Sequence, residues 1–350
     1  MQIGLIGLPG SGKTTIFQAL TGVRSSISTS SKREAANLAV VSVPDERVDK
    51  LSEIFRPKRT IYSSVEFTDV AGLQGVDTAR SKGFSSTFLA AARNVDVLGI
   101  VVGKFLPGSD PQAELEEIEL ELNLADLSVI QKRLERLNSE ISKTPAARRV
   151  ELEKERELLQ RLEQALTNDK PIRELEISAD EEKMLRGYGF LTAKPAFVIL
   201  NVAETEASKQ DLDLHLNLPT VQVSGIIEAE IAELPPDDAK AFLEDLGLRE
   251  PGINRVIKTA YDTANLISFF TVGEDEVRSW TVKSGATAVE AAGVIHSDFA
   301  RGFIRAEVVH YDDFIRVGSL AEARRQGLLR LEGKNYIVKD GDICHFLANV

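Results

Sequence analysis

The first 25 residues change from a strand pattern to a helix pattern. Residues 2–8 form a short apolar run that ends in a glycine-rich stretch, which is typical of a buried parallel strand. Beyond Lys13, the apolar side chains of Ile16, Phe17 and Leu20 fall on one helical face. The pattern therefore predicts a strand, a glycine-rich loop and a helix, in that order.

Apolar runs and helical patterns keep alternating along the first hundred residues and again after residue 195. Strands that alternate with helices indicate a doubly wound parallel sheet, so we expect an α/β domain. The predicted strands are 38–43, 60–68, 97–102, 195–201 and 220–224, and the predicted helices are 84–93 and most of 227–264.

The segment from about 113 to 166 differs, because it is charged and leucine-rich. Its apolar residues step by 3, 4, 3 and 4 positions, which is the narrow seam of a coiled coil. A proline at 145 interrupts the seam, and a second helix with further leucines follows. We expect an antiparallel helical hairpin with its tip near 143–149; two ordinary amphipathic helices packed on the sheet are the alternative. The seam is Leu127, Ile130, Leu134, Leu137 and Ile141.

The last part of the chain, from Ser268, is rich in β-branched and aromatic residues and predicts a small α+β domain. Its predicted strands are 269–272, 277–282, 304–309 and 336–338. The expected division of the chain is an α/β domain formed by 1–108 and 192–265, a helical insertion at 109–191, and the C-terminal domain at 266–350.

Composition narrows the class of protein. Of the 350 residues, 43% are hydrophobic and 27% charged, and no apolar run reaches the roughly 18 residues of a membrane span. The formal net charge of -12 argues against binding of nucleic acid over the whole surface of the protein. Cys344 is the only cysteine, and the N-terminus has no basic leader. We therefore expect a cytoplasmic protein without membrane contact.

A phosphate-binding motif occupies the first strand-to-helix junction. Gly7-Leu8-Pro9-Gly10-Ser11-Gly12-Lys13-Thr14 has the spacing G-x-x-x-x-G-K-T of a P-loop. Its glycines let successive main-chain N–H groups face phosphate oxygens, and the helix N-terminus adds a favourable dipole. We expect Lys13 to reach the β- and γ-phosphates as a catalytic residue, and the Thr14 hydroxyl to ligate magnesium. The residues expected to cradle the phosphates are Pro9, Gly10, Ser11, Gly12, Lys13, Thr14 and Thr15.

A second motif follows the predicted strand 60–68. Asp69 and Gly72 have the D-x-x-G spacing of switch nucleotidases. We expect Asp69 to hold magnesium through water. The N–H of Gly72 is expected to bond the γ-phosphate, as a second catalytic group.

A third motif, Asn201-Val202-Ala203-Glu204, stands where a guanine-specific site carries N-K-x-D. The lysine is missing, and glutamate replaces the aspartate whose carboxylate would pair with guanine. Because glutamate has an extra methylene, its carboxylate is displaced and guanine readout should be poor. The alternative is a strand-to-helix turn that Asn201 merely caps. The residues expected around the base are Asn201, Val202, Glu204 and, through its main chain, Ser224.

The predicted hairpin is locally basic. Residues 132–161 carry nine Lys or Arg and six Glu, a net of +3, within a chain of net charge -12. One interpretation is a contact with ribosomal RNA through Lys143, Arg148 and Arg149. The other is a solvated hairpin with ion pairs along its helices.

These motifs resemble those of the YchF family, the Obg-like ATPases among the translation-factor-related P-loop proteins. The resemblance covers nearly the whole chain, and its most specific parts are C-terminal. It rests on the P-loop and on 43–51, 65–73, 121–127, 201–204, 276–281, 291–299, 302–306, 332–336 and 339–342.

The resemblance implies a nucleotidase domain with an inserted helical hairpin, followed by a ubiquitin-like β-grasp domain called TGS. It implies ATP as the preferred nucleotide, read by N-x-x-E, and an association with ribosomes. It also implies slow hydrolysis, because Leu73 stands where many switch GTPases carry a water-orienting glutamine.

Several positions depart from the family pattern. Gly10 stands where the family usually has an asparagine that helps to hold potassium, which puts potassium stimulation in question. Arg33 takes the place of the switch-loop threonine that completes magnesium coordination, and Thr29 is the nearest threonine. Lys32 replaces the family's cysteine there, which argues against a redox switch. We expect good nucleotide binding and poor turnover.

Together these features predict a monomeric, nucleotide-dependent switch protein that binds ATP with Mg²⁺ and hydrolyses it slowly, with the ribosome or ribosomal RNA as partner. The nucleotide is expected to move the loops 24–37 and 73–84. Two alternatives stay open. One is a GTPase of the Obg type, and the other is a nucleotide-gated ribosome- or RNA-binding scaffold with little hydrolysis.

Overall fold

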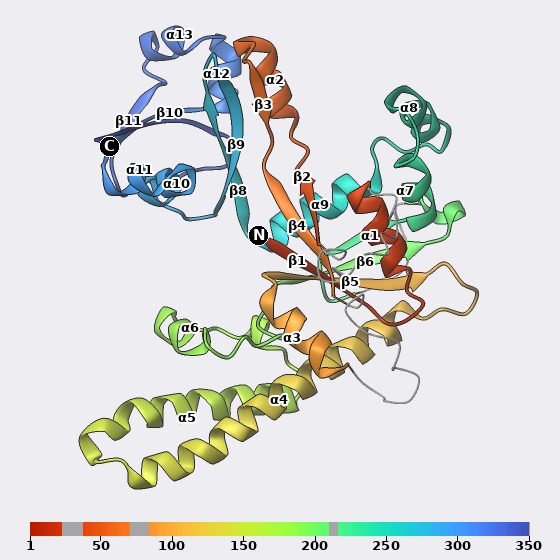
Figure 1. The fold of residues 1–350 in the computed structure, drawn as a ribbon, viewed down its shortest axis with the longest axis vertical. Helices are drawn as coiled ribbons and strands as arrows, with labels where there is room; N and C mark the ends of the chain where they lie inside the picture. The colour runs from red at the N-terminus through yellow and green to blue at the C-terminus, as the bar shows by residue number, and fades with distance from the viewer. Residues whose placement is uncertain (23–37, 71–83, 210–215, 350) are drawn as a thin grey trace, which may run out of the picture. The chain divides into compact units, whose positions relative to one another are not determined.

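The computed structural model describes residues 1–350 apart from 23–37, 71–83, 210–215 and 350. The chain forms two compact units (Figure 1). The first comprises Met1–Ala39 and Glu66–Val256, and the second comprises Val40–Val65 and Ile257–Val350. Across the described ranges, no helix combines the length and the apolar character that a membrane crossing needs.

The first unit is built on a six-stranded sheet of order β2-β4-β1-β5-β6-β7, although the end of β2 and the start of β4 belong to the segment 40–65 of the second unit. The pairings from β4 through β1, β5 and β6 to β7 are all parallel, so the predicted doubly wound sheet is confirmed. The central strands are apolar on both faces, as strands covered on both sides must be. The strands are β1 (Gln2–Ile6), β2 (Leu38–Ser42), β4 (Ser64–Asp69), β5 (Val97–Lys104), β6 (Ala196–Val202) and β7 (Thr220–Val223).

Helices cover both faces of this sheet (Figure 1). Helix α3 (Ser86–Asn94) and the start of α4 (Pro111–Lys143) pack on one face, where Phe88 and Ile118 meet alternate residues of β5 and β6. Helix α1 lies on the other face, beside α7. The remaining helices of this region are α1 (Lys13–Thr21), α7 (Gly225–Ile231), α8 (Pro236–Asp245) and α9 (Gly252–Thr263).

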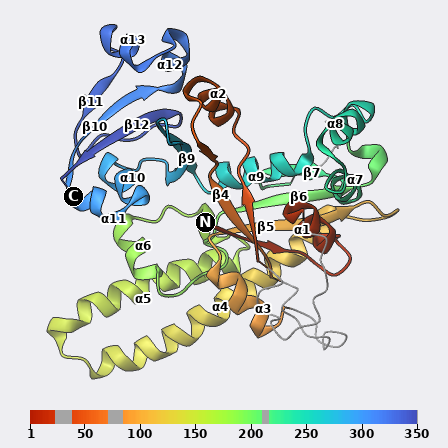
Figure 2. The ribbon, with the colours of Figure 1, turned by 45° about the horizontal axis from the view of Figure 1, so that its top comes forward.

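The charged, leucine-rich segment forms the predicted helical hairpin. Helix α4 (Pro111–Lys143) and helix α5 (Ala146–Thr167) run side by side, and the turn between them lies at the expected tip (Figure 2). Its far half has a core of its own, which excludes the alternative of two helices lying flat on the sheet. The seam residues buried in that core are Ile130, Leu137 and Ile141 from α4 and Leu159, Leu162 and Leu166 from α5. The chain returns through a short 3-10 helix, η2 (Ile172–Glu174), and α6 (Ala179–Leu185).

The second unit is an α+β domain with a mixed six-stranded sheet of order β11-β10-β12-β8-β9-β3. Helix α10 packs on one face of this sheet, and α2 and α12 pack on the other. The strands are β3 (Arg59–Ile61), β8 (Leu266–Val272), β9 (Glu276–Lys283), β10 (Phe303–His310), β11 (Arg330–Glu332) and β12 (Asp342–Ala348). The helices are α2 (Glu46–Phe55), α10 (Ala288–Ile295), α11 (Ser297–Arg301), α12 (Tyr311–Val317) and α13 (Leu320–Arg325).

One part of the expected division needs correction. Residues 40–65 were expected in the nucleotide-binding domain, but they belong to the second unit. Strand β3 pairs in parallel with β9, and Val48 and Leu51 of α2 are fully buried in the second unit's core. The strand predicted at 60–68 is therefore two strands in two different sheets, because Tyr62 and Ser63 separate β3 from β4.

The C-terminal strands also differ in detail from the prediction. Residues 336–338 form no strand; Ile337 makes only an isolated bridge to Thr287. The sequence pattern missed β12, which lies between β10 and β8 at the centre of the sheet. Residues 336–338 are only a short apolar triplet beside a turn, and β12 carries polar residues at 342 and 345, so neither segment shows a clear alternation of apolar and polar residues. Pairing with other strands of the sheet therefore determines which of the two forms a strand.

Candidate functional site

The loop between β1 and α1 has the geometry that its sequence predicts. Gly10 and Gly12 adopt φ angles of 92° and 81°, which side chains rarely tolerate. A turn is closed where the Ser11 N–H donates to the Leu8 carbonyl over 3.2 Å. A Cβ at Gly7 would lie 2.6 Å from the Val101 carbonyl oxygen of β5. The backbone conformation therefore favours glycine at positions 10 and 12, and the lack of space requires it at position 7. The loop leads into a helix N-terminus of the kind that binds anions.

Lys13 forms an ion pair with Asp69, so the P-loop and the D-x-x-G motif meet in space. Asp69 ends β4 and lies in register with Leu5 of β1, the strand that feeds the P-loop. Lys13 and Asp69 are only 7% and 4% exposed. Their attraction is thus little screened by water, and the pair fixes the lysine beside the loop.

The side-chain amide of Asn201 joins the P-loop to the loop after β7. Its Nδ2 donates to the Ser11 carbonyl over 3.1 Å, and its Oδ1 accepts the Gly225 N–H at 2.9 Å. The fit is close, because a Cβ at Gly12 would lie 2.1 Å from Asn201 Nδ2. Asn201 thus connects the phosphate side of the site to the predicted base side, which goes beyond capping a local turn.

Two serine hydroxyls at this junction lack partners. Ser11 Oγ and Ser224 Oγ are buried and accept or donate no hydrogen bond within the described ranges, and each residue is 2% exposed. Buried hydroxyls are normally paired, because an unmade bond costs about 1–3 kcal/mol. Both residues belong to the predicted nucleotide-binding set, and their free hydroxyls suit a polar ligand.

The donors expected for magnesium are oxygens, which is the chemistry that the ion prefers. They are the exposed Thr14 hydroxyl at the first turn of α1 and the buried Asp69 carboxylate. No group of three or more His, Cys, Asp or Glu side chains that could hold a metal occurs in the part of the chain that the structure describes. One carboxylate and one hydroxyl fit an ion that takes its other ligands from phosphates and water.

Comparison with known proteins identifies the family. The chain is 38% identical over its whole length to "Ribosome-binding ATPase YchF" of Bacillus subtilis (strain 168) and 42% identical to the protein of that name from Haemophilus ducreyi, covering 100% and 99% of them. The chain belongs to the YchF family. A solved structure, "Structure of the Schizosaccharomyces pombe YchF GTPase", matches 99% of this chain and 97% of its own, with a TM-score of 0.87 and 30% identity.

Two family models match separate parts of the chain. The model YchF-GTPase_C, described as "Protein of unknown function (DUF933)", matches residues 266–349. A model described as "50S ribosome-binding GTPase" matches residues 2–133. The predicted resemblance to the YchF family and the predicted fold class are both confirmed.

The other predicted site residues have different surroundings. Pro9 and Gly10 are exposed, Thr15 is half-buried, and Glu204 is exposed at the start of a short 3-10 helix, η3 (Glu204–Glu206). The Val202 side chain packs in the core beneath the sheet, so only its main chain can face a ligand. Gly72, Leu73, Thr29, Lys32 and Arg33 lie outside the described residues.

Sequence reasoning missed several groups that support the YchF site. Gly225 supplies the N–H that fixes Asn201, and a Cβ there would lie 3.3 Å from Asn201 Oδ1. Glu114 of α4 accepts the Gly103 N–H at the end of β5 over 2.9 Å, and burial raises its pKa. For Gly225, the sequence did offer a signal, because a glycine directly follows Ser224 at the end of a predicted strand. Glu114 gave none, because it looks like any acidic residue in the first turn of a helix.

A buried carboxylate anchors the helices behind this loop. Glu228 of α7 accepts the Gly252 N–H over 2.7 Å and the Ile253 N–H over 3.2 Å at the start of α9. Burial raises the pKa of Glu228, while these two bonds oppose the rise. The bonds satisfy orphan donors of α9 and so hold α7, whose N-terminus carries Gly225.

Proposed function

We propose that this YchF-family chain binds ATP with Mg²⁺ at the P-loop, hydrolyses it slowly, and works with ribosomes in the cytoplasm as a monomeric, nucleotide-dependent switch. The observation that carries the proposal is the bridge made by Asn201. It joins the Ser11 carbonyl to the Gly225 N–H and so brings a phosphate loop and a base loop into one site. The relatives named "Ribosome-binding ATPase YchF" support the nucleotide and the partner.

At the phosphate end of the proposed site, Lys13 is already held beside the phosphate-binding loop. Lys13 is paired with Asp69, and an arriving triphosphate offers it stronger negative charge. In the proposed complex, Lys13 turns to the β- and γ-phosphates while main-chain N–H groups of 10–15 hold the phosphate oxygens. Ser11 Oγ gains a partner there, which relieves its unmade hydrogen bond.

Magnesium would be held by the Thr14 hydroxyl and, through water, by Asp69. The ion would supply positive charge that offsets the charge on the transferred phosphoryl group. In the proposed complex, Lys13 and Asp69 exchange their mutual ion pair for the phosphates and for the ion's water shell, so one exchange serves both the lysine and the aspartate. The Gly72 N–H is proposed to bond the γ-phosphate.

At the base end, Glu204 follows Asn201 at the spacing where guanine-specific proteins carry aspartate. Its carboxylate is exposed and one methylene further from the chain. Adenine has no N1–H that could donate to a carboxylate, so the absence of this aspartate does not weaken adenine binding. We infer that ATP is preferred, with Asn201, Glu204 and the main chain of Val202 and Ser224 around the base.

Slow turnover follows from the absence of a polar side chain beside Gly72. Leu73 cannot orient water, so catalysis rests on positioning and on charge neutralisation by Lys13. The test is release of phosphate from ATP by the full-length protein and by Lys13→Ala, with and without ribosomes. We expect Lys13→Ala to abolish release. Unchanged release would mean that the activity is contamination, and would favour the scaffold alternative.

Ribosome binding is proposed to use the hairpin tip. Lys143 and Arg148 are exposed there, whereas Arg149 is half-buried and its Nε donates to the Thr144 carbonyl at the end of α4 over 2.6 Å. We expect Lys143→Glu with Arg148→Glu to weaken co-sedimentation with ribosomes, while Lys132→Glu with Lys154→Glu, remote from the tip, changes it less. Equal binding by all three proteins would remove the tip from the proposal.

A GTPase of the Obg type is the second candidate, because the structural relative is named a GTPase and the N-terminal family model is described as one. The two candidates share every phosphate-binding residue and differ only at the base. A comparison of the two nucleotides on the same protein separates them.

A further inference from the structure

The end of β5, at Gly103, lies against the phosphate-binding loop. A Cβ at Gly103 would lie 3.6 Å from Ser11 Cα, so this buried glycine is in direct contact with the main chain of the loop. In the neighbouring strand β6, Gly103 is in register with Asn201, whose amide bonds the Ser11 carbonyl. The position of Gly103 therefore affects both the loop and the side chain that holds it.

The pairing of β5 with β1 stops before Gly103. Strand β1 ends at Ile6, which is in register with Ile100, so Gly103 lies beyond the end of that ladder. A buried main-chain N–H needs a hydrogen-bond partner. The Glu114 carboxylate supplies one, because it accepts the Gly103 N–H over 2.9 Å. A side chain of the helical insertion thus takes the place that a strand residue would have had.

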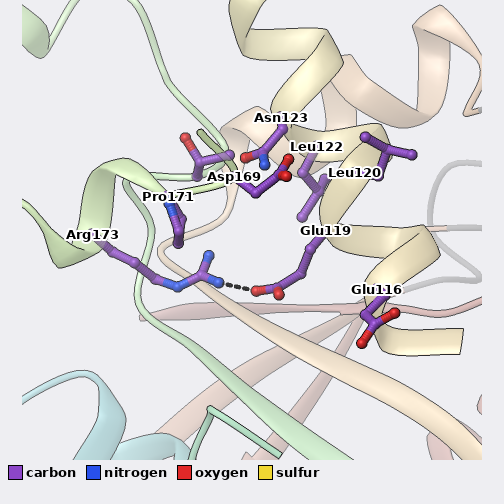
Figure 3. A pocket seen from close by; sticks show the side chains of 9 residues that line it. Glu116, Glu119, Leu120, Leu122, Asn123, Asp169, Pro171 and Arg173 are labelled. Atoms are coloured by element: carbon purple, nitrogen blue, oxygen red, sulfur yellow. Dashed lines mark hydrogen bonds and ion pairs between the residues drawn. The ribbon is translucent and has the colours of Figure 1, made fainter. Parts of the chain in front are cut away.

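Helix α4 holds Glu114 in place through the packing of its first turns. Leu115 and Ile118 are buried in the core under the sheet. Glu119 forms an ion pair with Arg173 of η2, which the dashed line in Figure 3 marks. The start of α4 is therefore attached both to the sheet and to the returning chain, and Glu114 has a fixed base from which to reach β5.

The contact with Gly103 is unfavourable for the carboxylate itself. Glu114 is partly buried, and this burial raises its pKa, while the hydrogen bond from Gly103 opposes the rise. The neighbouring carboxylate of Glu117 also raises the pKa of Glu114 by repulsion. Burying a carboxylate beside like charge opposes stability. A residue of this kind is expected where its position serves a function.

We propose that Glu114 is a positioning residue for the phosphate-binding loop and that it acts through Gly103. This role rests on the proposed function, since it assumes a triphosphate at the loop. With its N–H accepted, Gly103 stays against Ser11, and the main-chain N–H groups that face the phosphates keep their arrangement. Helix α4 is continuous from Pro111 to Lys143, so the helix that carries the hairpin also supports the phosphate site.

Two substitutions of similar length separate the hydrogen bond from the shape of the side chain. Glu114→Met removes the acceptor, whereas Glu114→Gln keeps a carbonyl oxygen that can accept the Gly103 N–H. We expect Glu114→Met to weaken ATP binding about tenfold, and Glu114→Gln to stay within about threefold of the parent. Isothermal titration calorimetry on the full-length protein with Mg²⁺ measures both. Glu117→Met, at an exposed position of the same helix, is the control and should leave the affinity unchanged.

Steady-state release of phosphate supplies a readout that a merely structural defect does not move. A misplaced loop raises KM for ATP, whereas a partly unfolded sample lowers kcat at an unchanged KM. We expect Glu114→Met to raise KM about tenfold and to change kcat less. Glu114→Ala also removes the acceptor and should give the same result, so the test stays valid even where Glu114→Met does not fold.

Any of three results overturns the positioning role. They are parent-like ATP affinity in both Glu114→Met and Glu114→Ala, equal losses in Glu114→Met and Glu114→Gln, or equal losses in Glu114→Met and Glu117→Met. Lys13→Ala, titrated alongside, separates this failure from a failure of the proposed function. Loss of ATP binding in Lys13→Ala but not in Glu114→Met would remove only the positioning role. Parent-like ATP binding by Lys13→Ala would remove the proposed nucleotide site as well.

Discussion

Asn201 Nδ2 donates to the main-chain carbonyl of Ser11 over 3.1 Å, although the two residues are 190 positions apart in sequence. Through its Oδ1, the same amide holds the Gly225 N–H. A single buried side chain therefore sets the position of the phosphate loop relative to the base loop. The arrangement makes Asn201 a positioning residue as well as a candidate contact of the base.

Asn201→Ala should damage both loops at once. It leaves the Gly225 N–H and the Ser11 carbonyl without their partner, at a cost of about 1–3 kcal/mol for each buried group. We expect a lower free energy of unfolding and weaker ATP binding by about tenfold or more. Chemical denaturation and nucleotide titration measure the two effects. Asn217→Ala, at an exposed position of the same unit, should change neither, and a similar loss there would show that the bridge is not the cause.

The two glycines of the P-loop with positive φ should respond differently to alanine. Both substitutions strain the backbone, by about 1–3 kcal/mol. Gly10→Ala meets nothing within 4 Å, whereas at Gly12 the new Cβ would lie 2.1 Å from Asn201 Nδ2. We expect Gly10→Ala to retain measurable ATP binding and Gly12→Ala to lose it. Equal affinities in the two variants would contradict the close packing of Asn201 against the loop.

The hairpin carries a pH-dependent link between its two helices. Arg133 of α4 makes two hydrogen bonds of 2.8 Å with the Glu155 carboxylate of α5, and Tyr188 also donates to it. Hydrogen bonding to Arg133 lowers the pKa of Glu155, which is partly buried. A carboxyl group whose pKa is lower in the folded than in the unfolded protein stabilises the folded state at pH values above its unfolded pKa, about 4.3. This stabilisation is lost as the pH falls through the pKa of the folded state.

Glu155→Gln should therefore destabilise the protein by about 1–2 kcal/mol at neutral pH. The difference from the parent should shrink as the pH falls below about 4. Denaturation measured over a range of pH checks both parts. Glu157→Gln, an exposed carboxylate on the same helix, is the control and should show neither effect. A difference that does not depend on pH would exclude the ion pair as its origin.

The assignment of residues 40–65 to the second unit has its own test. Leu51 is fully buried among Phe270, Val277 and Phe314 of that unit. Leu51→Ala should cost about 2–5 kcal/mol and should lower amide hydrogen-exchange protection in β8 and β9. Ile54→Ala, on the same helix at a position that is 39% exposed, should do much less. Unchanged protection in β9 would contradict the assignment.

Much of the nucleotide-binding fold could be predicted from sequence because its signals are local. The apolar run before Gly7 and the helical face after Lys13 are adjacent in the chain, and the leucine seam extends over several turns. The placement of β3 could not be predicted, since a short strand has the same pattern whichever sheet it joins. In the candidate site, too, only the features that are local in sequence could be predicted. The glycine and lysine spacing revealed the phosphate loop, but the partners of Asn201 and the ion pair between Lys13 and Asp69 depend on residues that are distant in sequence.

The most direct test of the proposed function is a side-by-side titration of the full-length protein with ATP and GTP in the presence of Mg²⁺. We predict tighter binding of ATP, because Glu204 stands where guanine recognition needs an aspartate, and we predict that Lys13→Ala weakens both nucleotides alike. Binding of GTP about tenfold or more tighter than ATP would contradict the assignment and favour a GTPase of the Obg type.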